Sequence, residues 1–553
     1  MSVQDLFYNP TNEQRHELFL QSLNRVGREA DYPYITELLS PPPDILEFAE
    51  PMSLRNFNIG IIGGGLAGLS AAYELKKLGA NITIFDAEGN RIGGRIYTHY
   101  FNNSRRYYGE FGAMRIPISH DTVWHYINLF NLNTESLSSP QANNFIFANN
   151  IRLRRNNSEN DIERNLYPLY DLTESERNTP WSELSSYAND TMLNSLTPEQ
   201  RSEILKILPK YSKEYAEITN LSNRQVYEML GLSQGFINLL SSIDPFAGAY
   251  LNVSHDDTMS ETYTQDYLNT YRITGGMINL PLAFINSLVN NNPNELSNLR
   301  GQLGKVNMKL GHVVNGISQS SNDYVNIQYT NPYGNDLSES FDMVICTIPY
   351  STLRDANLNP YFSSKKMQAI KEFNYMDSQK TNFFVNRRFW EEDTAFGNVN
   401  GGISFTDLII QSIVYPPDHI RCEGEECDYN EPGVFIASYN QGMDSIRLSN
   451  QNSFRRFNII KRDVEKVHGT PPGYLDTLID DSKTVFWNTE QWARGAFALA
   501  YPGQKVNFSY NMILPEYNNK VFFAGEHVST KPGWMQGSLQ TGKWVANQIA
   551  LYI

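Results

Sequence analysis

One arginine, Arg115, follows glycine, alanine and methionine in the stretch "YYGEFGAMRIP" at residues 107–117. Its guanidinium keeps its positive charge, so it needs an anion opposite it if the stretch is buried. A planar guanidinium can hold a carboxylate with two parallel hydrogen bonds and thereby fix its orientation. That carboxylate could belong to Glu110, which would make the pair structural, or to a bound substrate.

A second set of residues has the spacing of a dinucleotide site. Gly63, Gly65 and Gly68 form G-x-G-x-x-G directly after the apolar segment "NIGII" and at the start of a helical pattern. The first glycine allows a tight turn, the second lets the backbone approach a pyrophosphate, and the third lets the helix pack on the strand. Asp86 ends the next strand about 20 residues later, where an acidic side chain binds a ribose hydroxyl.

A further glycine pair follows in "NRIGGRIYT", which contains Gly93, Gly94 and Arg95. A second glycine turn suits another close approach of the backbone to the pyrophosphate. The arginine would add a charge-assisted hydrogen bond to it. The two turns together indicate that residues 63–95 bind one dinucleotide.

The order of the patterns indicates which elements position these residues. Residues 58–86 contain a strand, a glycine turn, an amphipathic helix and a second strand, which is one βαβ unit. Helical patterns dominate from about 155 to 255, where "TPEQ" and "SNRQ" have the form of capping boxes. Strand patterns return at "VNIQYT", "DMVICTIP", "TNFFVN" and "GVFIASYN", and the chain ends in a strand, a turn and a helix. This order predicts an α/β (α+β) fold.

Length and charge restrict the class of protein. A chain of 553 residues is expected to form two or three domains. The net charge of −15 argues against nucleic acid and membranes as partners, because phosphate backbones and anionic lipids bind basic surfaces. No secretory signal and no apolar run of membrane-spanning length is visible. A cytoplasmic protein is therefore expected, with secretion by another route left open.

The three cysteines do not indicate a disulfide-rich scaffold. Cys346 lies in an apolar strand pattern and is expected to be a core residue. Cys422 and Cys427 flank "EGEE", where a disulfide or a metal pair is conceivable, but two unpaired thiols are the preferred prediction. No metal site is predicted, because no His, Cys and Asp cluster has the spacing of a ligand set.

The glycine turns, "YGEFGAMRIP" and the C-terminal "FFAGEHVSTKPGWMQGSLQTG" together resemble the flavin-dependent amine oxidase superfamily. The chain is most similar to L-amino acid oxidases and the related amino acid 2-monooxygenases, from about residue 55 onward. The resemblance implies FAD as cofactor and an FAD-binding Rossmann-like domain joined to a mixed-sheet substrate-binding domain with a helical insertion. It predicts an FAD-binding domain of residues 55–97, 270–372 and 510–553, a substrate-binding domain of residues 1–54, 98–154 and 373–509, and a helical domain of residues 155–269.

The resemblance also assigns residues to the cofactor, most of them in the three motifs. Val314 comes from a strand pattern, and Trp487 and Trp492 come from "WNTEQWARGAF". The implied cofactor contacts are Gly63, Gly65, Leu66, Ala67, Gly68, Asp86, Gly94, Arg95, Gly112, Ala113, Met114, Arg115, Val314, Trp487, Trp492, Gly525, Glu526, Gly533, Trp534, Met535 and Ser538.

For the substrate, the resemblance implies that Arg115 and Tyr415 hold an α-carboxylate. Lys380 would hold a water near the N5 position of the flavin and assist the reaction with oxygen. The carbonyl of Gly533 and the ring of Trp534 would receive the substrate amino group and wall the pocket.

The function that follows from the resemblance is oxidative deamination of an L-α-amino acid to the 2-oxo acid, ammonia and hydrogen peroxide, with O₂ as acceptor. An amino acid 2-monooxygenase would use the same motifs, so this alternative stays open. Two further alternatives fit the motifs less well. Oxidation of amines or polyamines would leave Arg115 without a role, and a binding protein that has lost its flavin would leave the cofactor motifs without a role. A homodimer or higher homo-oligomer is expected. The sequence does not indicate which substrate side chain is preferred, because the helical insertion and loops line that part of the pocket.

Overall fold

Five parallel strands form the sheet that carries the dinucleotide motif. The computed structural model describes residues 8–552 except 140, 142, 156, 157, 321, 421 and 423–426. The strand order is β10-β2-β1-β14-β23, and each neighbouring pair is parallel. The strands are Asn58–Ile62 (β1), Asn81–Asp86 (β2), Val306–Leu310 (β10), Met343–Cys346 (β14) and Val521–Phe523 (β23).

Both faces of this sheet are covered, which explains why β1 is a continuous apolar run. Its alternate residues Ile59 and Ile61 belong to the core under one group of helices, whereas Ile62 faces a second, four-stranded sheet. The helices that pack here are α3 (Leu66–Lys77), α14 (Asn279–Val289) and α20 (Met535–Leu551). The second sheet has the order β13-β12-β11-β15, with strands Val313–Gln319 (β11), Val325–Thr330 (β12), Asp336–Phe341 (β13) and Asn357–Asn359 (β15).

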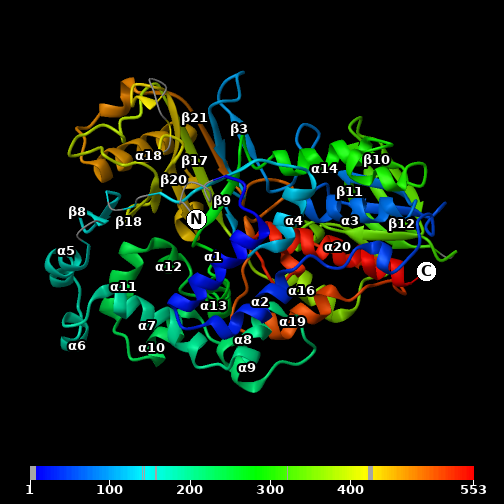
Figure 1. Cartoon of the computed structure of the whole chain (residues 1–553), viewed down its shortest axis with the longest axis horizontal. Coiled ribbons are helices and arrows are strands. Elements are labelled where there is room, and N and C mark those ends of the chain that lie inside the picture. The colour runs from blue at the N-terminus through cyan, green and yellow to red at the C-terminus, as the bar shows by residue number, and fades with distance from the viewer. Residues whose placement is uncertain are drawn as a thin grey trace.

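A seven-stranded sheet lies at the other end of the long axis from the parallel sheet (Figure 1). Its order is β21-β17-β20-β19-β18-β7-β8, and α18 (Ser453–His468) covers one face with apolar side chains. Its strands are Phe145–Ala148 (β7), Ile151–Arg154 (β8), Ser378–Val385 (β17), Gly402–Thr406 (β18), Ser412–Tyr415 (β19), Gly433–Gln441 (β20) and Ile479–Phe486 (β21).

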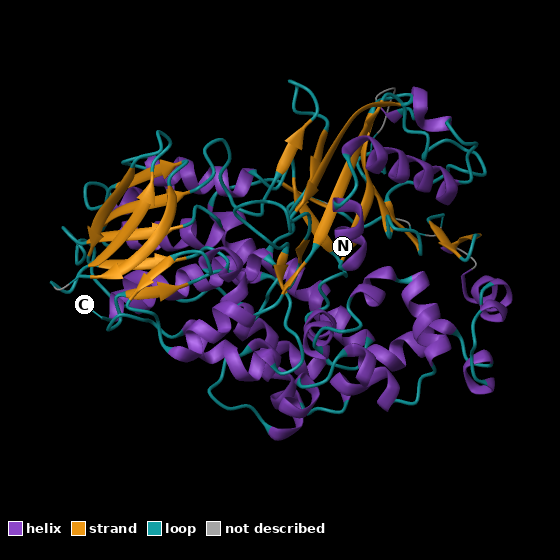
Figure 2. Cartoon of the chain, turned by 180° about the vertical axis from the view of Figure 1, so that it is seen from behind, coloured by secondary structure: helices purple, strands orange, loops and turns teal. Residues whose placement is uncertain are grey.

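The described elements between residues 158 and 263 are all helices, and Figure 2 shows them along one side of the molecule, below both sheets. Both predicted capping boxes are confirmed, at Thr197 and Ser222. Pro209 follows the helical turn that ends at Leu205 and separates it from the next helix. The helices are Ser158–Asn165 (α5), Glu174–Arg177 (α6), Trp181–Asn194 (α7), Pro198–Ser202 (α8), Lys213–Thr219 (α9), Asn223–Met229 (α10), Gln234–Ile243 (α11), Pro245–Ala249 (α12) and His255–Tyr263 (α13).

One small sheet joins strands from both sides of the predicted domain boundary at residue 270. Strand β9 (Thr270–Ile273) pairs with β5 (Ile116–Pro117) and β6 (Thr134–Ser136). Those strands lie in the range predicted to form the substrate-binding domain. The domain boundaries stay a prediction.

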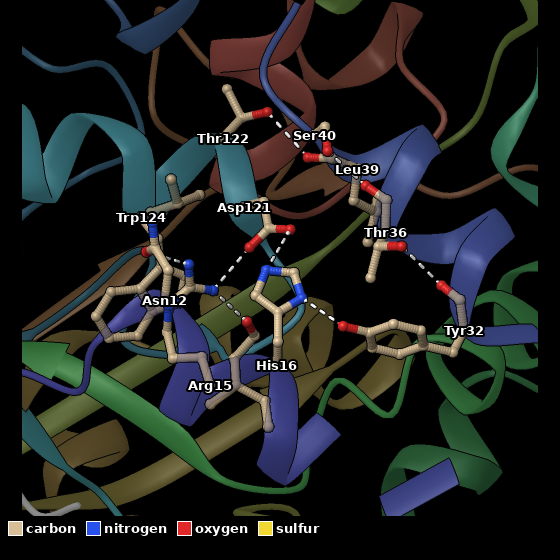
Figure 3. A network of polar contacts seen from close by, with 12 residues as sticks. Asn12, Arg15, His16, Tyr32, Thr36, Leu39, Ser40, Asp121, Thr122 and Trp124 are labelled. Atoms are coloured by element: carbon tan, nitrogen blue, oxygen red, sulfur yellow. Dashed lines mark hydrogen bonds and ion pairs between the residues drawn. The ribbon is translucent and has the colours of Figure 1, made fainter. Parts of the chain in front are cut away.

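The N-terminal helices α1 (Asn12–Arg25) and α2 (Tyr32–Leu39) support the segment that follows Arg115 (Figure 3). Arg15 donates hydrogen bonds of 2.7 Å to the Ile118 carbonyl and to Asp121, the first residue of α4 (Asp121–Leu129). His16 lies 3.3 Å from the second oxygen of Asp121. Because Arg15 is only 2% exposed, this ion pair is largely shielded from water.

Cys422 and Cys427 form a disulfide with their Cα atoms 5.5 Å apart. The prediction of two unpaired thiols was therefore wrong: a Cα separation of 5.5 Å lies within the range that a disulfide spans, which the sequence spacing alone does not reveal. None of the helices in the described part of the chain combines the length and apolar character needed to cross a bilayer.

Candidate active site

A cavity of about 450 Å³ begins at the carboxyl ends of the parallel strands and extends to the seven-stranded sheet and α13. This edge of a parallel sheet is where open α/β folds bind ligands. All but two of the predicted site residues line it, and the two exceptions are Gly68 and Tyr415. The predicted residues that line it are Gly63, Gly65, Leu66, Ala67, Asp86, Gly94, Arg95, Gly112, Ala113, Met114, Arg115, Val314, Lys380, Trp487, Trp492, Gly525, Glu526, Gly533, Trp534, Met535 and Ser538.

The two glycine turns lie side by side at one end of the cavity. The Gly93 amide donates to the Gly64 carbonyl over 3.1 Å, which joins the turns. A Cβ atom at Gly65 would meet no other atom within 4 Å, so this backbone is open to a ligand. A Cβ at Gly68 would lie 2.1 Å from the Gly63 carbonyl oxygen, so Gly68 acts through helix–strand packing. The arrangement fits a pyrophosphate bound at the start of α3.

Asp86 lies at the end of β2 with both carboxylate oxygens positioned by the backbone. Its Oδ2 accepts a 2.7 Å hydrogen bond from the Gly64 amide, and its Oδ1 accepts one of 2.8 Å from Glu88. Burial raises the pKa of Asp86. An ionised carboxylate has about four acceptor positions, so two remain for ribose hydroxyls.

Glu526 links the N-terminal and C-terminal cofactor motifs. Its carboxylate lies 2.6 Å from Arg95 Nη1 and accepts a 2.8 Å hydrogen bond from the Gly533 amide. Burial alone would raise the pKa of Glu526, but the charge of Arg95 and the hydrogen bonds from Arg95 and the Gly533 amide together contribute to lowering it. The next residue, His527, packs edge-on against Tyr350, and burial lowers its pKa to about 3, so it is a neutral packing residue.

Arg115 lies in the cavity wall with its guanidinium 5.8 Å from the ring centre of Tyr267. Glu110 is occupied elsewhere, because its carboxylate accepts hydrogen bonds from Thr98 Oγ1 (2.9 Å) and from the Met277 amide (2.8 Å). The structural alternative, a pair between Glu110 and Arg115, is therefore wrong. Among the described residues, Arg115 makes no ion pair with a carboxylate, so its charge is available to a ligand.

Lys380 and Tyr439 form a cross-strand pair beside Arg115. They are opposite each other in the β17–β20 ladder, and the Lys380 Nζ lies 4.7 Å from the ring centre of Tyr439. The same Nζ donates to the Gly112 carbonyl over 2.7 Å. Burial, followed by the charge of Arg115, lowers the pKa of Lys380 to about 7.

Tyr415 is a core residue rather than a ligand for the substrate. It is 2% exposed and packs with Trp390 and Phe435 in the core under α18. Its hydroxyl is already hydrogen-bonded to Ser404 Oγ (3.1 Å) and His468 Nε2 (2.9 Å). The prediction that Tyr415 binds the carboxylate is corrected accordingly.

Tyr439, which was not among the predicted site residues, lines the cavity in place of Tyr415. The β17–β20 register shifts between Thr381 and Asn382, which leaves Ala437 without a partner. This bulge reverses the alternation along β20, so Phe435 faces the core whereas Tyr439 faces the cavity. In the sequence, the local sign that this end of the strand faces a cavity is the pair of polar side chains at alternate positions, Tyr439 and Gln441.

Removing the Tyr439 hydroxyl tests this reassignment. We expect Tyr439→Phe to weaken the binding of a carboxylate ligand about tenfold, as for the loss of one hydrogen bond to a charged group. Tyr415→Phe should leave that dissociation constant unchanged and lower the melting temperature, because Ser404 and His468 lose a buried partner. Calorimetric titration and thermal melting of both variants check this, and the opposite pattern would restore Tyr415 as the ligand.

Tryptophans supply large flat surfaces to the cavity. Trp487 is held by a 2.8 Å hydrogen bond from its indole Nε1 to the Phe111 carbonyl. Trp534 precedes α20 and lies edge-on to His120, with ring centres 5.1 Å apart. Trp492 lines the cavity as well. Such walls suit a planar aromatic ring system.

Residues 66–550 match the family model described as flavin containing amine oxidoreductase. The chain belongs to the flavin-containing amine oxidoreductase family. The L-amino-acid oxidase of Vipera ammodytes ammodytes is 28% identical over 533 residues, covering 95% of this chain and 98% of the relative. That of Daboia russelii is 28% identical over 495 residues, covering 89% and 88%.

Among solved structures, putrescine oxidase bound to putrescine superposes on this amine oxidoreductase with a TM-score of 0.65 at 14% identity. The match covers 89% of this chain and 98% of putrescine oxidase, and it shows that the two share a fold. The fold is thus that of the FAD-dependent amine oxidases, and the cofactor of this oxidoreductase is FAD. The open backbone at Gly65, the two glycine turns and the tryptophan walls fit such a group.

Proposed function

We propose that this oxidoreductase converts an L-α-amino acid, O₂ and water into the 2-oxo acid, ammonia and hydrogen peroxide. The observation that carries the proposal is the guanidinium of Arg115, which faces the cavity while Glu110 is bonded elsewhere. An amine without a carboxylate would leave that charge without an anion, at a cost in free energy. The relatives named L-amino-acid oxidase support the same substrate class.

Bound FAD would supply the redox chemistry: it would accept the two electrons and the hydrogen that leave Cα as the Cα–N bond becomes an imine, and O₂ would receive the electrons. The protein's own residues bind and orient the substrate. Arg115 takes the α-carboxylate in a bidentate contact, and the Tyr439 hydroxyl adds a further hydrogen bond. The carbonyl of Gly533 and the ring of Trp534 receive the amino group. Holding the substrate in one orientation can itself account for much of a rate enhancement.

Product analysis tests the proposal. The purified holoenzyme, incubated with a panel of L-amino acids, should form 2-oxo acid, ammonia and hydrogen peroxide in equal amounts, and D-amino acids should be inert. Formation of an amide and carbon dioxide would identify an amino acid 2-monooxygenase instead. Turnover of polyamines without turnover of any amino acid would contradict the proposal. Assembly as a homodimer or higher oligomer stays a prediction, which light scattering can check.

A further inference from the structure

The wall of the cavity formed by α13 is acidic. Asp257 and Glu261 are four residues apart on this helix, so they share one face, and both line the cavity together with Ser260. The helix belongs to the all-helical part of the chain, whereas Arg115 and Lys380 come from the other walls. The cavity therefore has a cationic side and a side with two carboxyl groups. Burial raises the pKa of both carboxyl groups, that of Glu261 to about 7, so a cationic ligand would favour their ionised form.

Two buried acceptor atoms of residues that line the cavity, one on α13 and one at the end of β20, have no hydrogen-bond donor among the described residues. One is Oδ2 of Asp257, a residue only 8% exposed. The other is Oε1 of Gln441, a residue 4% exposed, whose Nε2 donates to the Tyr439 hydroxyl over 3.0 Å. Buried acceptors are normally satisfied, and leaving one unpaired is costly. Both atoms thus point to a ligand that brings its own donors.

The lysines nearest to this wall already form ion pairs with other carboxylates. Lys505 lies 3.0 Å from Asp256, and Lys531 lies 2.5 Å from Asp266. Glu261 accepts a 2.9 Å hydrogen bond from the Tyr267 hydroxyl, which is not a cation. In the described part of the chain, Asp257 and Glu261 therefore have no cationic partner of their own.

One tyrosine spans the distance between the two sides of the cavity. The Tyr267 ring lies under the guanidinium of Arg115 (5.8 Å), and its hydroxyl contacts Glu261. Arg115 and the acidic wall are thus about one tyrosine side chain apart. An extended aliphatic side chain with a terminal charged group has the same length scale, so one amino acid could contact both sides.

We propose that the acidic wall selects an L-amino acid with a cationic side chain, an ammonium or a guanidinium. This inference rests on the proposed function, since it assumes that Arg115 holds the α-carboxylate. The distal cation would donate to Asp257 Oδ2, Glu261 and Gln441 Oε1. An apolar side chain would instead leave the buried Asp257 Oδ2 and Gln441 Oε1 without a donor, which is unfavourable.

Binding of inert analogues to the wild-type holoenzyme tests this without any turnover. Hexanoate offers only the carboxylate, whereas 6-aminohexanoate adds a distal ammonium, and neither has an α-amino group. Calorimetric titration should give a dissociation constant at least tenfold lower for 6-aminohexanoate. Equal affinities would overturn the acidic-wall inference and leave the carboxylate site intact, whereas failure of both ligands to bind would overturn the proposed function as well.

Substrate comparison completes the test. The ratio of kcat/KM for L-lysine, L-ornithine or L-arginine to that for L-norleucine should be about 100 or more in the wild type. Asp257→Asn and Glu261→Gln should each reduce this ratio at least tenfold, while the melting temperature stays close to wild type. Oxidation of L-norleucine at a rate equal to or above that of the basic amino acids would overturn the inference and leave the proposed function standing.

Glu217→Gln is the matched control for the loss of one carboxylate. Glu217 lies exposed on α9, 3.7 Å from Lys213, and is not among the residues that line the cavity. Its loss should leave the preference unchanged. An equal fall in this control would show a general charge effect and overturn the inference.

Discussion

Arg115→Ala is expected to weaken the binding of a carboxylate inhibitor by about 2–5 kcal/mol, as when one member of a desolvated charge pair is removed. Arg115→Lys should weaken inhibitor binding nearly as much, because an ammonium cannot reproduce two parallel hydrogen bonds. FAD content and melting temperature should hardly change, since Glu110 is bonded to Thr98 and Met277 instead. Calorimetric titration with the inhibitor and thermal melting measure the two quantities on the same protein.

A buried arginine that does have an internal partner provides the control. Arg201 is 8% exposed, and its Nε donates to both oxygens of Asp31 over 2.9 Å. Arg201→Ala should lower the melting temperature strongly, because it removes the hydrogen-bonded partner of the buried Asp31 and leaves Arg28 at 4.0 Å, and inhibitor affinity should persist. If Arg115→Ala instead behaves like Arg201→Ala, with early melting and normal affinity, Arg115 is part of the scaffold.

Lys380→Met is expected to slow the reaction of the reduced enzyme with O₂ by about 10²-fold, the usual effect of removing one preorganised electrostatic contact. Anaerobic reduction by substrate should change little. The reason is that a positive charge stabilises the negative charge that oxygen acquires as it accepts an electron. Because the pKa of Lys380 is lowered to about 7, the charged form prevails below that pH. Reoxidation should therefore be faster on the acidic side, and stopped-flow absorbance measures both half-reactions.

Lys366 is a matched buried lysine away from the residues that line the cavity. Burial lowers its pKa to about 7 as well, and its Nζ donates to the Met512 and Leu514 carbonyls over 2.7 Å. Lys366→Met should reduce stability and leave both half-reactions near wild type. Equal slowing of reduction and reoxidation in Lys380→Met would contradict the assignment of Lys380 to oxygen.

Residues that act through local backbone geometry were predictable from the sequence. Gly63, Gly65 and Gly68 have the predicted positions, since a strand, a tight turn and a helix are fixed within a few consecutive residues. The strand pattern that ends at Asp86 belongs to the same short unit. The βαβ unit and the helical segment followed from hydrophobic periodicity and capping boxes, whereas the rest of the FAD-binding domain was implied by the resemblance.

Residues that depend on distant pairing were not predictable. Tyr439 faces the cavity because of the bulge at Ala437, since a one-residue shift moves every later side chain of β20 to the other face. Asp257 and Glu261 have the spacing of one helix face in the sequence, but only tertiary packing determines that this face lines the cavity. The missed residues are therefore those on the surfaces where separate parts of the chain meet.

The N-terminal support shown in Figure 3 affects where the chain can be shortened. The family match begins at residue 66, yet Arg15 holds the Ile118 carbonyl and Asp121, a few residues after Arg115. A gene trimmed to the family boundaries would remove that arginine and expose the apolar surface that α1 and α2 cover. We therefore expect a stable form of this oxidoreductase to need the helices α1 and α2, although they precede the family match.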